Sequence, residues 1–514
     1  MRFVHVKLRL APRAPYYVLA GFTALLAIGF GVLDYVAPAG RPLAKVAGYD
    51  PVNYFAISHS LLFDHDFNLN NEFTKIKPDG DLWSAVRPET GLPGSPWGIG
   101  YSILEIPFLA TGTALDAITG NSADGFSRFA TYVYCLGNVI MMGLGLMALF
   151  TLLNRMAALW GVQGERSAGY SLFVTFAIFC GTNVGYYTFS QLAHSSAFWL
   201  ASTFLAYWWS IRFTHQTRSW FLLGFIGGFL SITRWQDLIY LGGPLLFDLM
   251  GRELWKSPLP WLRSRICYGV ALGLCWIPQI AEWKIIYGKY LTIPQGEGFL
   301  SFPPAFMREV LLSSRNGWFS WTPLVLLGIA GLFYGAMKYT REFVPWIVVI
   351  LLEVAAVGSM QTWHGFDSFG ARYLLSTTPL VAMGLMSLLC AASTVVRRSL
   401  VVATVCCCIF AILFAIQFRL DLIPKNETLT ATEIFTDKLH LLKVRQRKMM
   451  AAQARKLLEE GDPKAAIETL ERAVSLGEDR DVLYALREAY KVGGKAAEAE
   501  SAKTRLKALL ASTL

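Results

Sequence analysis

Four carboxylates stand close together between residues 48 and 73 of a 514-residue chain in which only 16% of residues are charged. They are Asp50, Asp64, Asp66 and Glu72, and they follow the first long apolar run. A carboxylate that is partly withdrawn from water can act as a base, because burial raises its pKa toward neutrality. The Asp64-His65-Asp66 spacing also suits a divalent cation such as Mg²⁺ or Mn²⁺. Asp and Asn are ordinary turn residues as well, so a loop that needs no metal is the alternative.

The Arg residues that could bind an anion lie next to the outer ends of apolar runs. Arg315 and Arg372 are expected at the depth of a lipid phosphate, and a guanidinium offers paired donors to phosphate oxygens. Arg234 and Arg87 are further candidates, although Arg234 could instead pair with Asp237. The alternative is a structural role for these Arg residues, in which they snorkel to the membrane surface or anchor the topology. We predict phosphate binding, because Arg315 and Arg372 fall outside the membrane, against the usual bias of basic residues toward the inside.

Four more polar residues could contact a ligand. His364 in Trp-His-Gly and His194 at the start of an apolar run each suit such a role, although a single His at an interface also serves in packing. Glu105 interrupts an apolar run and would be costly in lipid, so we expect it to face a cavity. Glu72 suits the orientation of a cation or a hydroxyl group better than the role of base.

A short helix should position Asp50. Pro51 suits the first position of a helix, and Asp50 can cap its free N–H groups. An amphipathic helix on a membrane surface is predicted by the roughly helical spacing of Tyr54, Phe55, Ile57, Leu61 and Leu62. Asp50 would then lie at the rim of a membrane-embedded cavity.

The composition indicates a polytopic membrane protein, because 54% of residues are hydrophobic and many apolar runs reach the ~18 residues needed to cross a bilayer. The first run, 16–33, lacks a small-residue cleavage site, so we expect it to be retained. The net charge of +10 does not indicate nucleic-acid binding, because the basic residues collect between apolar runs. All eight Cys fall inside those runs, which argues against a disulfide framework or a Cys metal site.

We predict eleven spans, at 16–33, 126–153, 169–188, 194–211, 220–235, 238–250, 266–283, 318–337, 343–360, 373–392 and 399–418. With a cytoplasmic N-terminus, which carries Arg2, Lys7, Arg9 and Arg13, every inside connection is basic. The segment 98–115 is expected to dip in from outside without crossing, since Pro107 interrupts it. The loop 34–125 and the C-terminal tail are then external.

The tail differs in kind from the rest of the chain. We divide the chain into a membrane domain over 1–420, a charged connector over 421–448 and a helical tail over 449–514. The tail is rich in Ala, Glu, Lys and Leu, and its turn signals at 461–463 and 493–494 lie about 33 residues apart. This pattern resembles tetratricopeptide repeats, of which roughly two fit. Such a tail should pack on the membrane domain or pair with another protein.

Several short motifs carry a resemblance to a known superfamily. They are the first loop with its early Asp and D-x-D … N-E-F tail, and the segments Gly94–Tyr101, Ser313–Pro323 and His364–Tyr373. In order and spacing they resemble the GT-C superfamily of polytopic glycosyltransferases, in the arm that contains protein O-mannosyltransferases and aminoarabinose transferases. The resemblance covers residues 14 to 420. Ala371 stands where many relatives have Pro, which leaves the loop conformation open while Arg372 is kept.

The resemblance implies an all-α membrane enzyme that transfers a sugar, with inversion, from a polyprenyl-phosphate donor at the periplasmic face of a bacterial inner membrane. It implies Asp50 as the base, and it retains Arg372. From the residues themselves we predict Arg372, Arg315, Arg234 and Arg87 as phosphate ligands, and Glu72, His364, His194 and Glu105 as contacts to sugar or acceptor. No cofactor is required, with a divalent cation at Asp64 and Asp66 as an option. The acceptor is a glycan, a lipid or a protein. The alternatives are transfer from a pyrophosphate-linked donor, a lipid or solute transporter, and a non-catalytic scaffold.

Overall fold

The structure is a computed structural model that describes residues 13–36, 49–76, 86–190, 192–420, 422–423, 425, 428–435 and 439–512. Within these residues every named secondary-structure element is a helix. The only β pairing among them consists of two isolated bridges, Val86 with Pro93 and Leu300 with Met360. The predicted all-α class is therefore confirmed.

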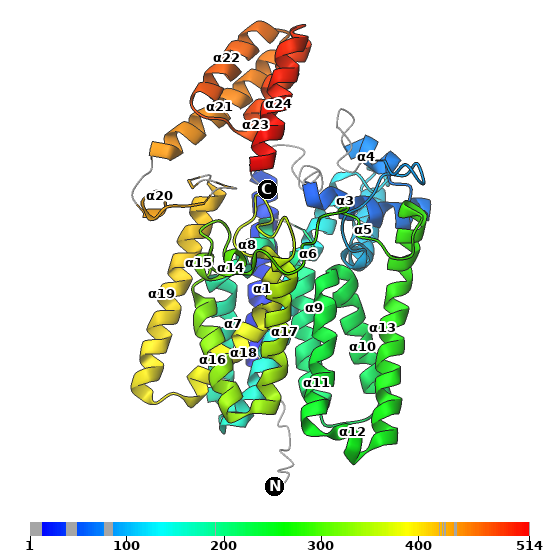
Figure 1. The fold of residues 1–514 in the computed structure, drawn as a ribbon, viewed down its shortest axis with the longest axis vertical. Coiled ribbons are helices and arrows are strands. Elements are labelled where there is room, and N and C mark those ends of the chain that lie inside the picture. Colours follow the sequence, from blue (N-terminus) through cyan, green and yellow to red (C-terminus); the bar gives the residue numbers. More distant parts are fainter. Residues whose placement is uncertain are drawn as a thin grey trace.

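Long helices run side by side along the vertical axis and form a bundle (Figure 1). Each of the eleven predicted spans coincides with a helix or a helix pair of this bundle. They are α1 (Ala14–Val36), α6 (Arg128–Met156), α7 (Gly164–Gly181) with α8 (Asn183–Ser190), α9 (His194–Ile211), α10 (Thr217–Thr233), α11 (Gly242–Gly251), α13 (Pro258–Tyr287), α16 (Leu324–Lys338), α17 (Thr340–Gly358), α18 (Thr378–Ala391) and α19 (Thr394–Arg419).

Four segments of the described chain are long and apolar enough to cross a membrane, and they make this an integral membrane protein. They are Ala14–Val32, Arg128–Trp160, Arg372–Ala391 and Thr394–Arg419. A fifth results if α7 and α8, which meet at a bend of 63°, form one broken span. The remaining helices of the bundle are shorter or less apolar, so the count of eleven and the orientation stay predictions. Arg2, Lys7 and Arg9, on which the orientation partly depends, lie outside the described residues.

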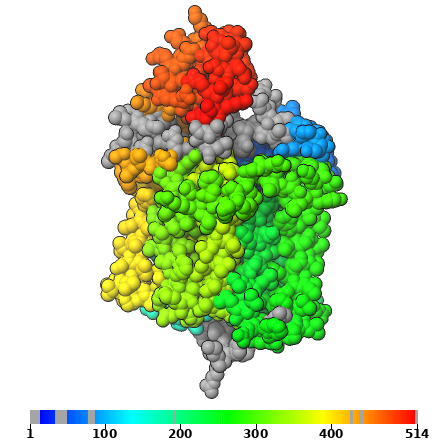
Figure 2. Space-filling model, in the orientation of Figure 1, coloured from blue at the N-terminus to red at the C-terminus, as the bar shows by residue number. Residues whose placement is uncertain are grey.

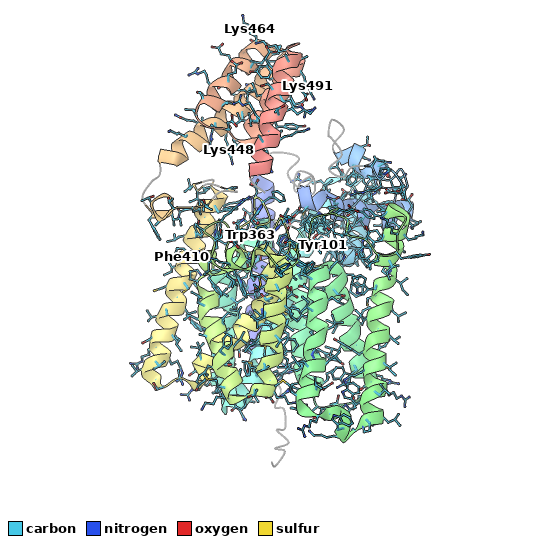
Figure 3. All side chains as sticks on the ribbon, viewed as in Figure 1. Tyr101, Trp363, Phe410, Lys448, Lys464 and Lys491 are labelled. Atoms are coloured by element: carbon cyan, nitrogen blue, oxygen red, sulfur yellow. The ribbon has the colours of Figure 1, made fainter. Side chains whose placement is uncertain are left out.

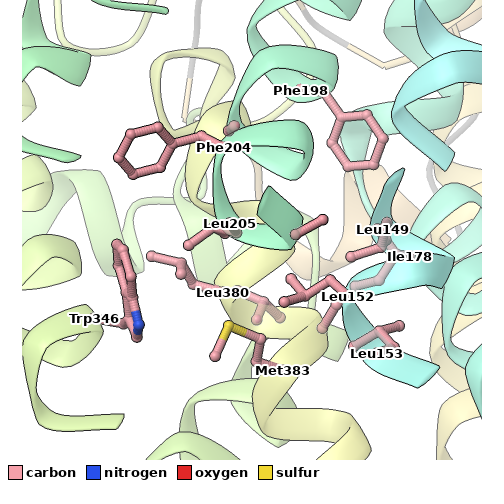
Figure 4. Packing of buried hydrophobic residues seen from close by; sticks show 14 of the residues in the cluster. Leu149, Leu152, Leu153, Ile178, Phe198, Phe204, Leu205, Trp346, Leu380 and Met383 are labelled. Atoms are coloured by element: carbon pink, nitrogen blue, oxygen red, sulfur yellow. The ribbon is translucent and has the colours of Figure 1, made fainter. Parts of the chain in front are cut away.

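The largest core lies where α6, α7, α9, α17 and α18 pack together. Figure 4 shows Leu149, Leu152 and Leu153 of α6 facing Leu380 and Met383 of α18, with Phe204 and Trp346 nearby. Small residues allow α16 (Leu324–Lys338) and α18 to cross closely, because a Cβ atom added to Gly384 of α18 would collide with the carbonyl oxygen of Gly328 on α16. Close approach through glycine is how apolar helices gain packing contacts within lipid.

A layer of loops and short helices covers one end of the bundle (Figures 1 and 3). It contains α3 (Tyr49–His59), η1 (Ser60–Asp64), α4 (Asn70–Ile76), α5 (Gly100–Ile118), α14 (Met307–Leu312) and α15 (Trp318–Trp321). Tyr101 and Trp363 mark this level in Figure 3. Two 3₁₀ segments, η3 (Trp235–Leu241) and η4 (Arg372–Thr377), connect bundle helices. At the opposite end η2 (Ala157–Trp160) and α12 (Glu253–Lys256) close the bundle.

The helix α3 differs from the prediction in one respect. Every residue from Asp50 to Ser60 is buried, so α3 is not an amphipathic helix lying on a surface. Its apolar side chains pack on α5 and α6, for example Phe55 on Tyr134 with ring centroids 5.1 Å apart. The other sides of the helix are covered as well. The hydroxyl of Ser58, for example, donates a hydrogen bond to the carbonyl oxygen of Ser102 at 2.9 Å.

The tail extends beyond the loop layer, at the same end of the bundle (Figure 2). After α20 (Ala431–Phe435) it consists of α21 (Leu439–Glu459), α22 (Pro463–Ser475), α23 (Arg480–Val492) and α24 (Ala496–Ser512). These four helices share an apolar core of their own. The predicted turn at 461–463 starts α22, where the Asp462 carboxylate accepts a hydrogen bond from the N–H of Ala465 at 3.0 Å. The helix α21 begins inside the predicted connector, and the resemblance to tetratricopeptide repeats stays a prediction.

Candidate functional site

The site is built around one buried ion pair. Asp50 lies in the first turn of α3, and Arg372 opens η4. The Arg372 Nη1 group donates to the Asp50 Oδ2 atom at 2.5 Å. Asp50 is 8% exposed and Arg372 is 5% exposed. Removing one of two such buried partners leaves the other as an uncompensated charge, which destabilises the folded protein.

Aromatic and polar side chains surround the pair. Tyr54 lies one turn after Asp50, and burial, followed by the negative charge of Asp50, raises the pKa of its hydroxyl. The ring of His194 stacks on that of Tyr187, with the ring centroids 4.3 Å apart. The positive charges of Arg234 and Arg372 interact electrostatically with this imidazole. The structure thus brings together residues from α3, α8, α9 and η4 at the loop-covered end of the bundle.

The loop 361–372 folds back against the side chain of its own last residue, Arg372. Gly365 has a φ of 67°, and a Cβ atom there would lie 2.7 Å from the Arg372 Nε atom, so a side chain at this position would collide with the guanidinium. The His364 Nδ1 atom accepts a hydrogen bond from the N–H of Phe366 at 3.0 Å. These contacts fix His364, which is 2% exposed, in the loop that carries Arg372.

Arg315 belongs to a second loop that is tied to the first. Its neighbour Asn316 has a φ of 60° and donates to the carbonyl oxygens of His364 at 2.7 Å and of Phe366 at 3.2 Å. The two loops therefore form one unit beside the ion pair. The half-buried Arg315 itself has its N–H held by the hydroxyl of Ser313 at 3.0 Å.

Arg234 is bonded to the backbone of the site. Its Nη1 group donates to the carbonyl oxygen of Arg372 at 2.8 Å. The alternative pairing with Asp237 is not seen as an ion pair in the described residues, and the carboxylate of Asp237 instead accepts from the hydroxyl of Ser376 at 2.7 Å. Arg234 thus belongs to the Asp50–Arg372 cluster, as a neighbour that supports Arg372.

Two candidates lie apart from the ion pair. Glu105 is fully buried on α5 against α6, where a Cβ atom on Gly137 would lie 2.3 Å from its Oε2 atom. Arg87 lies over the ring of Tyr287 at 4.9 Å and donates to the carbonyl oxygen of Pro294 at 3.3 Å. The first side chain packs between helices, and the second joins the first loop to the loop after α13.

A separate cluster could hold a cation. Ligand atoms of His59, Asp64 and Glu72 all lie within 4.8 Å of one another. The His59 Nδ1 atom is 2.9 Å from the Glu72 Oε1 atom, and the Glu72 Oε2 atom is buried with no hydrogen-bond partner in the described part of the chain. Burial raises the pKa of Glu72, and the hydrogen bond from His59 offsets part of this shift. Two carboxylates with an imidazole suit Mn²⁺ better than Mg²⁺, since imidazole is the softer ligand.

Asp66 is not part of this cluster. Its Oδ1 atom accepts from the Ser60 hydroxyl at 2.8 Å and from the N–H of Asn68 at 2.9 Å, as in an Asx turn. Asp64 does belong to the cluster, and the hydrogen bond from Asn71 lowers its pKa. The predicted Asp64 and Asp66 pair is thus divided between a ligand cluster and a turn.

Two residues of these clusters, His59 and Asn183, are missing from the site residues predicted from the sequence. His59 lies only five positions before Asp64. Asn183, which is 3% exposed, follows the break between α7 and α8 and donates to the carbonyl oxygen of Ala371 at 3.3 Å. The polar Thr-Asn pair after Gly181, inside an apolar run, was the signal for this break.

No family model matches the chain, and no curated protein matches it. Among solved structures, it is similar to the crystal structure of ArnT from Cupriavidus metallidurans bound to undecaprenyl phosphate. The two chains share 14% sequence identity with a TM-score of 0.45, and the similarity covers 95% of this chain and 79% of that chain.

Proposed function

We propose that the protein is a membrane glycosyltransferase that moves one sugar, with inversion, from a polyprenyl-phosphate donor to an acceptor hydroxyl group. The observation that carries the proposal is the buried pair of Asp50 and Arg372 at the loop-covered end of an apolar bundle. A carboxylate and a guanidinium are the two groups that the reaction needs, a base for the acceptor and a positive charge for the leaving phosphate.

The donor phosphate would replace Asp50 as the partner of Arg372. Guanidinium binds phosphate oxygens through paired hydrogen bonds, and Arg234 and Arg315 lie in segments bonded to the same loops. This exchange releases the Asp50 carboxylate beside the sugar, where it can accept a proton. The bound donor therefore frees the base that the next step needs.

In the reaction, the acceptor oxygen forms a bond to the anomeric carbon of the sugar. The bond from that carbon to the phosphate oxygen breaks, and the polyprenyl phosphate leaves with the electron pair. Asp50 takes the proton of the acceptor hydroxyl. Direct displacement of this kind inverts the anomeric centre and needs no covalent intermediate with the protein.

The proposal includes an orientation. The tail helices lie at the same end of the bundle as α3 and α4 (Figure 1), which carry Asp50 of the ion pair and His59 and Glu72 of the cation cluster, and we assign this end to the periplasmic or external face. The basic connections that are predicted to lie inside would then face the cytoplasm. Protease protection of the tail in right-side-out and inverted vesicles tests this assignment.

The deciding experiment is sugar release by the purified protein with a panel of radiolabelled polyprenyl-phosphate sugars. Wild type is compared with Asp50→Asn, with and without EDTA. Turnover of a donor that is lost in Asp50→Asn supports the proposal. Binding to a pyrophosphate-linked donor alone would instead favour an oligosaccharyltransferase or O-antigen-ligase type of reaction, and transport of a lipid without sugar release would contradict both.

A further inference from the structure

The short segment that carries Arg372 is fastened along its length by side chains of η3. We infer that η3 positions Arg372 in the candidate site, with Asp237 and Tyr240 as positioning residues. The inference rests on the proposed function, in which Arg372 binds the donor phosphate.

Four hydrogen bonds join η4 to η3 and to Arg234, the residue immediately before η3, and we call them together the η3–η4 seam. Arg234 donates to the carbonyl oxygen of Arg372 at 2.8 Å, and Gln236 donates to that of Tyr373 at 3.4 Å. One turn further along, the hydroxyl of Tyr240 donates to the carbonyl oxygen of Ser376. The Ser376 hydroxyl donates back to the Oδ1 atom of Asp237 at 2.7 Å. Asp237, Tyr240 and Ser376 are all 0% exposed.

The seam matters because η4 is a 3₁₀ segment. Hydrogen bonds within a 3₁₀ helix have poorer geometry than those of an α-helix, so its backbone gains more from donors outside it. In a buried setting a carbonyl oxygen that loses its donor is left with the full cost of desolvation. The side chains of η3 therefore fix the backbone from which the Arg372 guanidinium extends.

A further contact holds the residue immediately before η4. Asn183 donates to the carbonyl oxygen of Ala371 at 3.3 Å. With the seam, the backbone is held immediately before, at and after Arg372. In the described residues no hydrogen bond links Asp237 or Tyr240 to Asp50, so their effect on the site passes through η4 and Arg372.

The test compares two Tyr→Phe substitutions that each remove one hydrogen bond from a hydroxyl to a carbonyl oxygen. Tyr240→Phe removes one of the four bonds of the seam, and Tyr339→Phe removes the bond to Leu159 at the opposite end of the bundle. The measurement is the Kd for a polyprenyl phosphate in nanodiscs. We expect Tyr240→Phe to weaken binding about tenfold, as for one lost hydrogen bond, and Tyr339→Phe to leave it unchanged. Equal weakening by both would overturn the inference.

A cycle with Arg372→Lys identifies the route of the effect. If η3 acts through Arg372, Tyr240→Phe weakens binding in the wild-type background and adds little to Arg372→Lys. The same factor in both backgrounds would show that Tyr240 acts independently of Arg372. If Tyr240→Phe does not fold, Ser376→Ala takes its place in the cycle, because it removes the bond to Asp237.

The cycle also separates this inference from the proposed function. A wild-type protein that binds no polyprenyl phosphate contradicts the proposed function. The seam is then judged only from thermal unfolding of the four proteins of the cycle, which are the wild type, the two single variants and the double variant. Coupled effects of Tyr240→Phe and Arg372→Lys on the melting temperature support it, and additive effects refute it.

Discussion

The Asp50 carboxylate and the Arg372 guanidinium meet at 2.5 Å although 322 positions of sequence separate them. One comes from α3 in the first loop, and the other opens η4, the segment immediately before the bundle helix α18. Their contact joins the first loop to the segment before α18 at the candidate site. It also makes the protein's stability depend on the same two groups as its proposed reaction.

Asp50→Asn should therefore lower stability and abolish sugar release together. Loss of one member of a buried pair costs about 3–5 kcal/mol, because the other charge is left without a partner. The double variant Asp50→Asn with Arg372→Gln should recover much of that stability without recovering turnover. Thermal unfolding and sugar release measure the two effects. A double variant less stable than Asp50→Asn would show that the two charges do not compensate each other.

The cation cluster predicts different behaviour for two neighbouring aspartates. Mn²⁺ should raise the melting temperature of the wild type, because a ligand that binds only the folded state stabilises it. Asp64→Asn should remove this shift, since Asp64 belongs to the cluster with His59 and Glu72. Asp66→Asn is the matched control and should retain the shift, because Asp66 is engaged in a turn. Metal content after dialysis provides a second readout. Loss of the shift in Asp66→Asn alone would refute this assignment.

Much of the fold could be predicted because apolar length is a local signal. Each predicted span coincides with helices of the bundle, and the helix after Asp50 was foreseen from Pro51 and the spacing of apolar residues. Burial of α3 could not be foreseen, because it depends on α5, α6 and the loop at Phe126, which close around the helix. Periodicity shows which residues share a face, whereas the number of covered faces is set by tertiary contacts.

The site was predictable in its charged residues and less so in their partners. Asp50 and Arg372 were selected from motifs, whereas His59 was missed because of a local irregularity. The π-helical turn Ser60–Asp64 shifts the helical phase, which brings Asp64 beside His59 and Glu72. The roles of Asp237 and Tyr240 depend on contacts across more than 130 positions, and no local pattern marks them.

The opposite end of the bundle gives a prediction for acid pH. Glu253 is half-buried and accepts hydrogen bonds from Lys256 at 3.1 Å and from Arg341 at 2.9 Å. Burial alone would raise the pKa of Glu253, but these two cations outweigh it and hold the pKa below the usual 4.5. The ion pairs of Glu253 with Lys256 and Arg341 therefore stabilise the fold above pH 4.5. This stabilisation is lost as the pH falls through the lowered pKa of Glu253.

Glu253→Gln should then lower stability by up to ~1 kcal/mol at neutral pH and have little effect near pH 3. Denaturation of both proteins across this range measures the difference. Glu297→Gln, in an exposed loop, is the control and should not change the pH dependence. A deficit in Glu253→Gln that persists unchanged at the lowest pH would mean that packing, and not charge, is responsible.

In the described part of the chain, an ion pair joins the tail to the loop that carries Arg372. Arg480, at the start of α23, donates to the Asp367 carboxylate at 3.1 Å, and Asp367 belongs to the loop that wraps Arg372. Both side chains are roughly half exposed, so the pair contributes less than ~1 kcal/mol to stability. We expect its effect on the order of the loop to be larger than its effect on stability, since the loop carries Arg372, the proposed phosphate ligand.

Arg480→Asp should therefore increase hydrogen exchange in residues 361–372, and the charge swap of Arg480→Asp with Asp367→Arg should restore protection. Arg505→Asp is the matched control, because it breaks an ion pair with Glu478 inside the tail, at 2.6 Å, and leaves the loop contact in place. If Arg505→Asp loosens the loop as much, the effect comes from general destabilisation of the tail. If only Arg480→Asp does so, the tail holds the loop of Arg372 directly, and an acceptor or a partner bound to the tail would act on the site through this contact.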